Sequence, residues 1–297
     1  MMDLRQLRHF VTVAEELHFG RAAARLAMTQ PPLSQSIRAL EEELGVALFL
    51  RDKRNVALTP AGAGWLPEAR ALLASAAGLP ELARRLARGE RGSLRLAFVS
   101  TADYSVLPPL VARFKAAFPD VDLALAEMTS DLQIEALLAE TIDAGIVIAL
   151  PRASLHPALS YRALTSEPLV AAVPRAWLDA GRIALARGRL RVEDAGGEPL
   201  IIFPRRIAPV LHDIVTGTFA KAGAAPRIGQ EAIQMQTIIS LVSAGMGLAL
   251  VPRSLENLAR SGVAYVPLEG DAPQIETGLL WRTQSPSPSV GRLVELA

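Results

Sequence analysis

The sequence predicts an α/β protein with a helical start, a long connecting helix and two lobes of alternating strands and helices. Three features lead to this prediction. Residues 1–58 show helical spacing with short connections, residues 60–88 form one segment rich in Ala, Leu and Arg, and apolar runs alternate with helical stretches after residue 93. Because strands and helices alternate, we expect the sheet to be mostly parallel.

Composition limits the class of protein. A chain of 297 residues suggests two or three domains, and 51% hydrophobic with 21% charged residues indicates a globular protein. The absence of cysteine excludes disulfides and thiolate chemistry. The net charge is +1, although residues 1–92 hold 13 Lys or Arg against 10 Asp or Glu. Neither a secretory signal nor an apolar run of about 20 residues is found, so we expect a cytoplasmic location and no membrane partner.

Helical spacing predicts a helix-turn-helix near the N-terminus. Four apolar residues give the first helix an inward face: Phe10, Val13, Ala14 and Leu17. A short helix follows at residues 20–26, and a turn at residues 27–29 leads into the next helix. His9 and His18 are expected to pack or to face solvent on the first helix.

The helix after this turn has two unlike faces. Its apolar stripe consists of Leu33, Ile37, Leu40 and Leu44. The opposite face carries Pro31, Ser34, Gln35 and Arg38. Short amides, hydroxyls and an arginine suit base edges and phosphates in a major groove. Prolines are tolerated in a first helical turn, and Thr29 is placed to cap it.

Residues 48–59 are predicted to form two short strands around a basic turn. Arg51, Lys53 and Arg54 lie at its tip, where a wing would contact phosphates. The alternative is that residues 1–58 are only a small helical domain with solvated polar faces. Small-residue packing, a proline-opened helix, a polar face and a basic hairpin in this order favour a winged helix-turn-helix that binds DNA.

A long linker helix is predicted next. Thr59 and Pro60 provide a cap and a first helical residue. The segment then carries an apolar stripe made of Leu66, Leu72, Leu73, Leu79, Leu82 and Leu86. A lone helix could not keep this stripe in water, so a second copy of the chain is its natural partner. Pro67 and Pro80 are expected to bend the helix.

The rest of the chain predicts two α/β lobes. Strands are expected at residues 94–99, 121–128, 144–150, 169–174, 199–203, 227–232, 247–252 and 275–282. Helices are expected near residues 105–117, 131–140, 210–222 and 235–244. Residues 284–289 are interpreted as a short low-complexity tract. The last strand comes late enough to return to the first lobe, so two crossings would hold a ligand between the lobes.

Hydroxyl pairs follow the first two strands of the first lobe. They are Ser100 with Thr101 and Thr129 with Ser130. Strand ends that meet helix starts favour anions, and both pairs would face one cleft. The alternative is that these residues simply cap the following helices. Arg205 or Arg206 of the segment 201–206 would come from the other lobe, which favours a site for a carboxylate.

Two other classes of protein compete with a regulator. For an enzyme, the chain has only four histidines, in no metal-ligand spacing, and no nucleophile elbow. Gly245 and Gly247 precede a strand, whereas a dinucleotide loop would follow one. We therefore predict no catalytic residue, metal or cofactor. The remaining alternative is a solute-binding protein for small carboxylates, which residues 93–297 alone could support.

These motifs together resemble the LysR-type transcriptional regulators, most specifically over residues 4–62. The resemblance implies a winged helix-turn-helix domain at residues 1–59, a linker helix at 60–92, and an effector domain at 93–297 that is like the periplasmic binding proteins. Lobe I would comprise about residues 93–165 plus 268–297, and lobe II about residues 166–267. It also implies a homotetramer, a dimer of dimers, on an interrupted palindrome of double-stranded DNA that contains T and A.

The resemblance further implies which residues bind. DNA contacts would come from Gln30, Pro31, Pro32, Ser34, Gln35 and Arg38, with Arg54 in the wing. Segments 97–101 and 127–145 look most like members that sense aromatic-pathway carboxylates, whose inducer meets the hydroxyl positions and the turn formed here by Phe203, Pro204 and Arg205. Control of a metabolic operon by a small carboxylate inducer, with RNA polymerase as a further partner, is the function expected.

Overall fold

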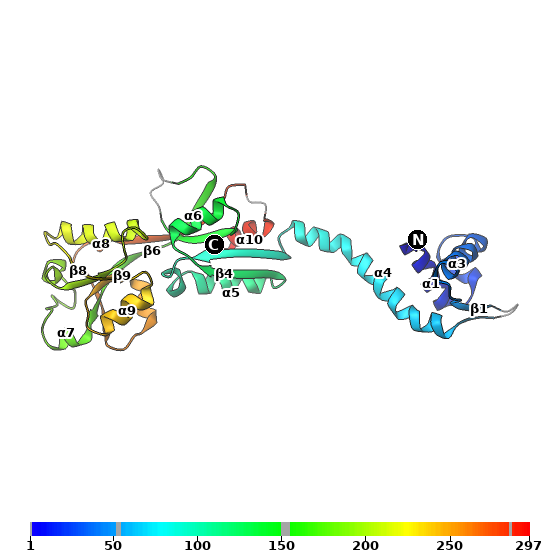
Figure 1. Ribbon diagram of the computed structural model, residues 1–297, viewed down its shortest axis with the longest axis horizontal. Coiled ribbons are helices and arrows are strands. Elements are labelled where there is room, and N and C mark those ends of the chain that lie inside the picture. Colours follow the sequence, from blue (N-terminus) through cyan, green and yellow to red (C-terminus); the bar gives the residue numbers. More distant parts are fainter. Residues whose placement is uncertain (1, 52–54, 150–154, 285–286) are drawn as a thin grey trace. The chain divides into compact units, whose positions relative to one another are not determined.

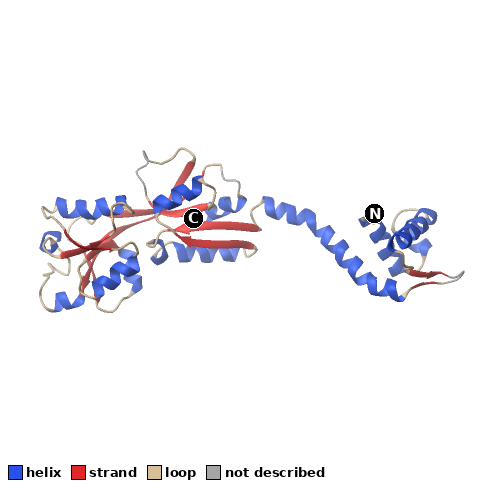
Figure 2. Cartoon of the chain, viewed as in Figure 1, coloured by secondary structure: helices blue, strands red, loops and turns tan. Residues whose placement is uncertain are grey.

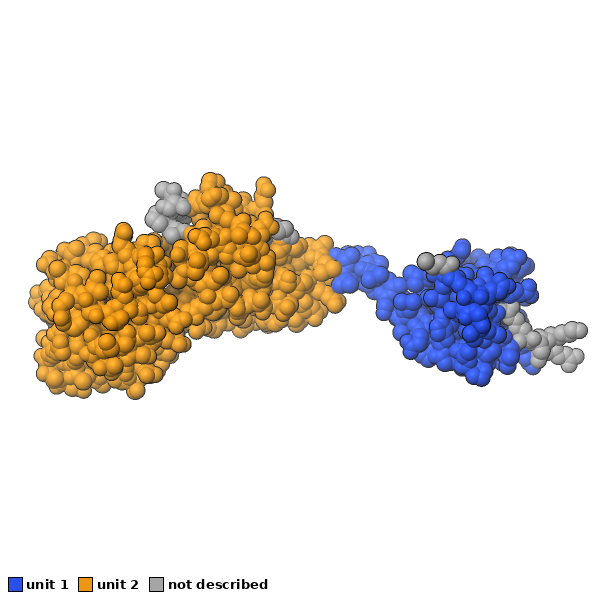
Figure 3. Space-filling view, viewed as in Figure 1, with its two compact units in different colours: residues 1–84 blue, residues 85–297 orange. Residues whose placement is uncertain are grey.

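The computed structural model describes residues 2–51, 55–149, 155–284 and 287–297. The chain divides into two compact units, residues 1–84 and residues 85–297 (Figure 3). Each unit has hydrophobic clusters of its own.

The first unit contains a helix-turn-helix and a hairpin (Figure 1). Its elements before the linker are α1 (Leu4–Glu16), α2 (Phe19–Arg25), α3 (Gln30–Leu44), β1 (Phe49–Arg51) and β2 (Val56–Leu58). β1 and β2 pair antiparallel. The winged helix-turn-helix predicted from the sequence is confirmed in these elements.

The core of this module lies between the three helices. Phe10 and Leu33 are fully buried in it, and the ring of Phe10 lies 4.9 Å from that of Trp65. Two members of the predicted apolar stripes are exceptions. Leu17 is exposed because it is the left-handed C-cap of α1, and Leu44 is exposed because it is the last residue of α3.

The linker helix α4 runs without interruption over Pro60–Ala87, and both inner prolines lie within it. Thr59 caps its start as predicted, because the Thr59 Oγ1 accepts a hydrogen bond from the Gly62 N–H at 2.9 Å. Within the chain, several of the predicted stripe residues remain exposed, with exposed fractions of 47% for Leu72, 59% for Leu79 and 44% for Leu86. Leu66 and Leu73 pack against the core of the first unit, whereas the described chain leaves these three leucines uncovered.

The second unit begins with three parallel strands. β3 (Gly92–Phe98) lies between β4 (Val121–Glu127) and β5 (Ala144–Ile148), and both pairings are parallel. Two helices follow β3 and β4, namely α5 (Leu107–Ala117) and α6 (Ser130–Leu138). These elements form lobe I.

Two long strands then connect the lobes. β6 (Leu159–Pro174) spans 16 residues, and β11 (Gln274–Arg282) pairs antiparallel with both β6 and β5. The last strand therefore returns to lobe I, as predicted. The prediction of a mostly parallel sheet is wrong for the main sheet that the structure describes, whose order is β10-β6-β11-β5-β3-β4 with β9 on β6. Every pairing of β6 and β11 in it is antiparallel.

Lobe II is built on the second half of β6. It adds α7 (Arg175–Asp179), β7 (Pro199–Ile202), α8 (Pro209–Lys221), β8 (Arg227–Glu231), α9 (Met235–Ser243), β9 (Ala249–Pro252) and β10 (Val263–Pro267). Short 3-10 turns are η1 (Ala102–Tyr104), η3 (Val192–Ala195) and η4 (Arg253–Leu258). β7 and β8 pair parallel. Figure 2 shows helices lying against the strands in both lobes.

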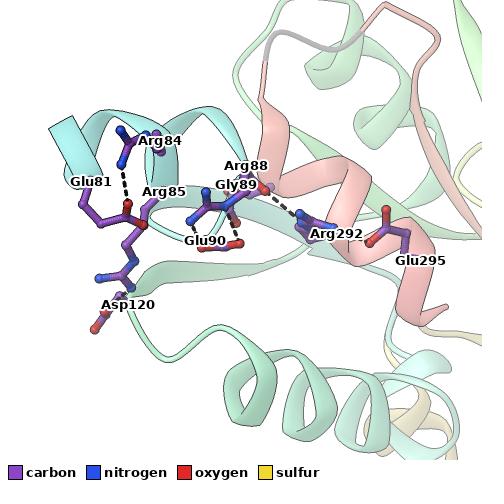
Figure 4. A network of polar contacts seen from close by, with 10 residues as sticks. Glu81, Arg84, Arg85, Arg88, Gly89, Glu90, Asp120, Arg292 and Glu295 are labelled. Carbon is purple, nitrogen blue, oxygen red and sulfur yellow. Dashed lines mark hydrogen bonds and ion pairs between the residues drawn. The ribbon is translucent and has the colours of Figure 1, made fainter.

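The end of the linker helix is joined to the C-terminal helix α10 (Pro288–Leu296), which begins inside the predicted low-complexity tract. Gly89 has a φ of +68°, and a Cβ there would lie 2.5 Å from the carbonyl carbon of Pro288. The Arg292 Nε donates a hydrogen bond of 2.8 Å to the Arg88 carbonyl (Figure 4). Only glycine fits this joint without displacing backbone.

Candidate functional site

The outward face of α3 carries the polar residues that the sequence assigns to DNA recognition. Gln30, Pro31, Pro32, Gln35 and Arg38 are exposed, and Ser34 is half-buried. Leu33, Ile37 and Leu40 on the other face are buried in the module's core. The structure therefore brings these six residues together in the first part of the same helix.

The start of α3 lacks the predicted cap bond. Thr29 is the N-cap residue, but its side chain makes no capping hydrogen bond. A capping hydroxyl accepts from the N–H of the second or third helical residue, and both of these residues, Pro31 and Pro32, lack an N–H. The expectation that Thr29 caps α3 is therefore right in position and wrong in bonding.

The back of α3 is held by His9, for which the sequence predicts packing or solvent exposure on the first helix. His9 of α1 is buried, and its Nδ1 lies 2.8 Å from the Ser36 Oγ. Burial lowers the pKa of His9, and the nearby Arg5 cation lowers it further. His18 lies outside α1 and is instead the N-cap of α2, accepting hydrogen bonds from the N–H groups of Gly20 and Arg21.

The hairpin is only partly described. Arg51 ends β1. Lys53 and Arg54, the other predicted wing contacts, lie outside the described residues.

A cavity of about 330 Å³ lies between the two lobes of the second unit. Both predicted hydroxyl pairs and Phe203 line it. Its other polar lining residues are Glu127, Asp131 and Gln234. Its apolar lining consists of Val99, Met128, Leu132, Ile134, Ile148, Ile207, Ala208, Pro209, Val210, Leu211 and Ile233, together with Phe203. The structure thus brings together strand ends and helix starts that lie far apart in the sequence.

The hydroxyls at this cavity do not act as simple helix caps. Thr101 and Thr129 are N-cap residues whose side chains make no capping bond. Their Oγ1 atoms are buried and have no hydrogen-bond partner among the described residues. Ser130 differs, because its Oγ accepts a hydrogen bond of 3.2 Å from the Ile148 N–H. Two buried hydroxyls therefore remain able to bind a ligand.

Three helices start at the cavity. α6, α8 and α9 begin after Thr129, Ala208 and Gln234 respectively, all of which line it. None of these three N-cap residues makes a side-chain capping bond. Free N–H groups and the positive ends of the helix dipoles therefore point to an anion as a suitable occupant.

The turn after β7 contributes less than expected. Pro204, Arg205 and Arg206 are not among the lining residues. The Arg205 guanidinium donates to both carboxylate oxygens of Asp213, at 2.7 and 2.9 Å, and this pairing lowers the pKa of Asp213. Sequence spacing gives no sign of this pairing, because a turn separates the two residues.

No group of three or more His, Cys, Asp or Glu in the described part of the chain is arranged to hold a metal ion. Among the described helices, none combines the length and the apolar character that a membrane span requires.

Family models match nearly the whole chain. Residues 4–63 match the model of bacterial regulatory helix-turn-helix proteins of the lysR family, and residues 87–297 match the LysR substrate binding domain. The chain belongs to the LysR family of transcriptional regulators. This regulator therefore combines a DNA-binding helix-turn-helix domain with a substrate-binding domain, and the resemblance seen in the sequence is confirmed.

Relatives and solved structures agree with this assignment. The regulator is 56% identical over 295 residues to the HTH-type transcriptional regulator IlvR of Caulobacter vibrioides, covering 99% of this chain and 97% of that one. It is 39% identical over 301 residues to AlsR of Bacillus subtilis, covering 100% and 95%. A crystal structure of full-length CbnR complexed with its target DNA matches with a TM-score of 0.82 at 32% identity, covering 99% and 98%.

Proposed function

We propose that this LysR-family regulator controls a metabolic operon in response to a small carboxylate bound between the lobes of its substrate-binding domain. The observation that carries the proposal is a cavity that joins uncapped helix starts and two buried hydroxyls without a hydrogen-bond partner in the described part of the chain. The ligand would act on DNA binding rather than undergo a reaction.

The proposed DNA contacts are on α3 and the wing. Gln35 and Arg38 would read base edges or phosphates in the major groove, with Gln30 and Ser34 beside them. Pro31 and Pro32 would present a rigid apolar edge to thymine methyl groups. Arg51, Lys53 and Arg54 of the wing would neutralise phosphates.

The exposed leucines of α4 support pairing of two copies through the linker helix. A two-fold dimer would place two recognition helices in successive grooves of a palindrome, and a dimer of dimers would extend the site. Such an assembly would act in the cytoplasm and contact RNA polymerase.

The two crossings between the lobes provide the means of response. β6 and the segment that leads into β11 are the connections on which the lobes would change their angle when a ligand bridges the cavity. A ligand that binds more tightly to the conformation with one angle between the lobes shifts the population toward that conformation. The affinity of the assembled regulator for DNA would change accordingly.

Fluorescence anisotropy with DNA from the regulator's own upstream region tests this proposal. We expect salt-weakened binding that the Gln35→Ala, Arg38→Ala variant loses by at least about ten-fold. The matched control Arg113→Ala removes an exposed cation from α5 and should bind normally. Retention of affinity in the double variant would move the contacts elsewhere. Small-carboxylate binding without DNA binding to any genomic fragment would favour a solute-binding protein instead.

A further inference from the structure

The charges around the cavity are of one sign. Glu127 and Asp131 contribute carboxylates to its lining, whereas no Lys, Arg or His belongs to the lining among the described residues. Both acidic residues are exposed and stand at the start of α6 or just before it. A ligand that carries several negative charges would meet repulsion here, and no cation of the described lining offsets it.

A single negative charge is nevertheless favoured at one place. α6 and α8 belong to opposite lobes, have nine and 13 residues, and both begin at the cavity without a capping side chain. Each helix start carries roughly half a positive charge and free N–H donors. Thr101 is an independent sign of a ligand there, because it is only 3% exposed and its Oγ1 has no described partner.

The remaining lining is apolar. Residues from both lobes supply it, among them Ile148 from β5, Phe203 after β7 and Ile233 before α9. The cavity volume of about 330 Å³ is at the small end of ligand sites. The body of the ligand must therefore be small and must lose water favourably.

We infer that the cavity selects a small monocarboxylate with an apolar body and disfavours dicarboxylates, with Glu127 and Asp131 as the specificity-determining residues. The carboxylate lies at the starts of α6 and α8 and accepts a hydrogen bond from the Thr101 hydroxyl. The apolar body lies against the aliphatic wall. This inference rests on the proposed function, because it names the class of ligand for the same site.

Calorimetric titration of the full chain with matched probes tests the inference. Hexanoate and adipate share a six-carbon chain but carry one and two carboxylates, and benzoate and terephthalate form a second such pair. Each monocarboxylate should bind roughly five-fold to ten-fold more tightly than its dicarboxylate. Hexanamide, which has no charge, should bind more weakly than hexanoate. Equal or tighter binding of the dicarboxylates or of hexanamide, or no binding of either monocarboxylate, would overturn the inference.

Variants identify the residues responsible. Glu127→Gln together with Asp131→Asn should strengthen adipate binding several-fold and hexanoate binding by less, so that the difference between the two affinities shrinks. The matched control Glu135→Gln removes a carboxylate from α6 at an exposed position outside the lining. It should leave the difference between hexanoate and adipate affinity unchanged. Thr101→Val should weaken hexanoate binding more than hexanamide binding, because a hydrogen bond to a charged carboxylate is stronger than one to an amide carbonyl. If the double variant still binds hexanoate more tightly than adipate by the original factor, these two carboxylates do not determine the specificity.

DNA anisotropy on the same preparations separates the two proposals. Normal DNA binding together with a preference for dicarboxylates would contradict only the inference that the cavity selects monocarboxylates. Loss of DNA binding to every genomic fragment defeats the proposed function, whichever acid the cavity prefers.

Discussion

The starts of α3 and α6 are built alike but suit different ligands. Each helix follows a threonine in extended conformation, with φ and ψ of −86° and 156° at Thr29 and −71° and 157° at Thr129. Neither threonine makes a capping bond. After Thr29 come Pro31 and Pro32 in the first turn, whereas Asp131 holds the matching place after Thr129.

The difference shows how one local motif can serve two kinds of recognition. The prolines remove N–H donors from the start of α3, so its polar contacts must come from side chains such as Gln35. The start of α6 keeps its N–H groups, so its backbone can bind an anion. These opposite arrangements suit the proposed contacts of α3 with DNA bases and of α6 with a small anion.

The two helices are also anchored by different chemistry. His9 holds the back of α3 through Ser36, and its charge depends on pH. The buried Gln133 holds α6, because its Nε2 donates to the carbonyls of Met128 and Ile146 at 2.9 and 3.1 Å. Gly145 leaves the room that this amide needs, since a Cβ there would lie 2.3 Å from the Gln133 Oε1.

Replacing Gln133, the amide that holds α6, should have the largest effect on stability. We expect Gln133→Met to lower the free energy of unfolding of the second unit by about 2 kcal/mol, because the Met128 carbonyl loses its buried donor. Urea unfolding followed by Trp177 and Trp281 fluorescence measures this. Gln274→Met, which changes an exposed glutamine of β11, is the control and should be nearly neutral. Equal losses in both variants would remove Gln133 as the anchor.

Alanine substitutions of the three N-cap threonines should differ clearly in their cost to stability. Thr59→Ala should cost about 1–2 kcal/mol, because Thr59 makes a true cap bond to Gly62 and also donates to the Ala47 carbonyl at 2.8 Å. Thr29→Ala and Thr129→Ala should each cost less than about 0.5 kcal/mol, since no cap bond is lost. Thermal unfolding of the three variants measures the ranking. A cost at Thr29 that equals the cost at Thr59 would contradict the uncapped start of α3.

The anchor of α3 should respond to pH and the anchor of α6 should not. The pKa of His9 lies below its usual 6.5 when folded, so the unfolded chain binds more protons as the pH falls below that value. The stability of the module should therefore fall toward acid pH, by at most about 1.4 kcal/mol per pH unit. Trp65 reports this unfolding in a chain with Trp177→Phe and Trp281→Phe.

Two histidine substitutions complete this test. His9→Gln should abolish the dependence between neutral and mildly acid pH, because glutamine does not titrate. His156→Gln, at an exposed position in the second unit, should leave it intact. A dependence that survives His9→Gln belongs to another group.

Restoring donors to α3 should have the smallest effect on stability. In Pro31→Ala, Pro32→Ala, the Thr29 hydroxyl gains N–H partners, but the unfolded chain gains freedom of similar free energy, so the net change should stay within about 0.5 kcal/mol. Adding Thr29→Ala should then cost about 1 kcal/mol, unlike the same change in the native chain. A double-mutant cycle from thermal unfolding measures this coupling, and additive effects would show that the prolines do not block the cap.

Sequence patterns predicted the helix-turn-helix and most strands because burial imposes a period that the residues display. The first half of β6, residues 159–168, was missed because its half-buried faces form no apolar run. Because β6 pairs antiparallel with its neighbours, the antiparallel character of the main sheet was missed as well. The start of α10 was masked by a Ser-Pro repeat, although Ser287 and Pro288 are a typical helix opening.

The lining of the cavity could be predicted only in part from the sequence. The hydroxyls at 100–101 and 129–130 could be placed together because the ends of parallel strands share one edge of a sheet. The pairing of Arg205 with Asp213 depends on how a turn meets α8, and it holds the Arg205 guanidinium on Asp213, outside the described lining of the cavity. Buried, unpartnered atoms such as the Thr101 Oγ1 become visible only when every neighbour is in place.

The joint at Gly89 also sets an order of events on the ribosome. The Ser289 hydroxyl that donates to the Gly89 carbonyl lies 200 residues further along the chain. Synthesis at about 5–20 residues per second separates the two by roughly 10–40 s. The helix-turn-helix is thus complete in the nascent polypeptide well before the linker helix is clamped. A product released before Pro288 would lack this clamp, because neither Pro288 nor Ser289 would be present.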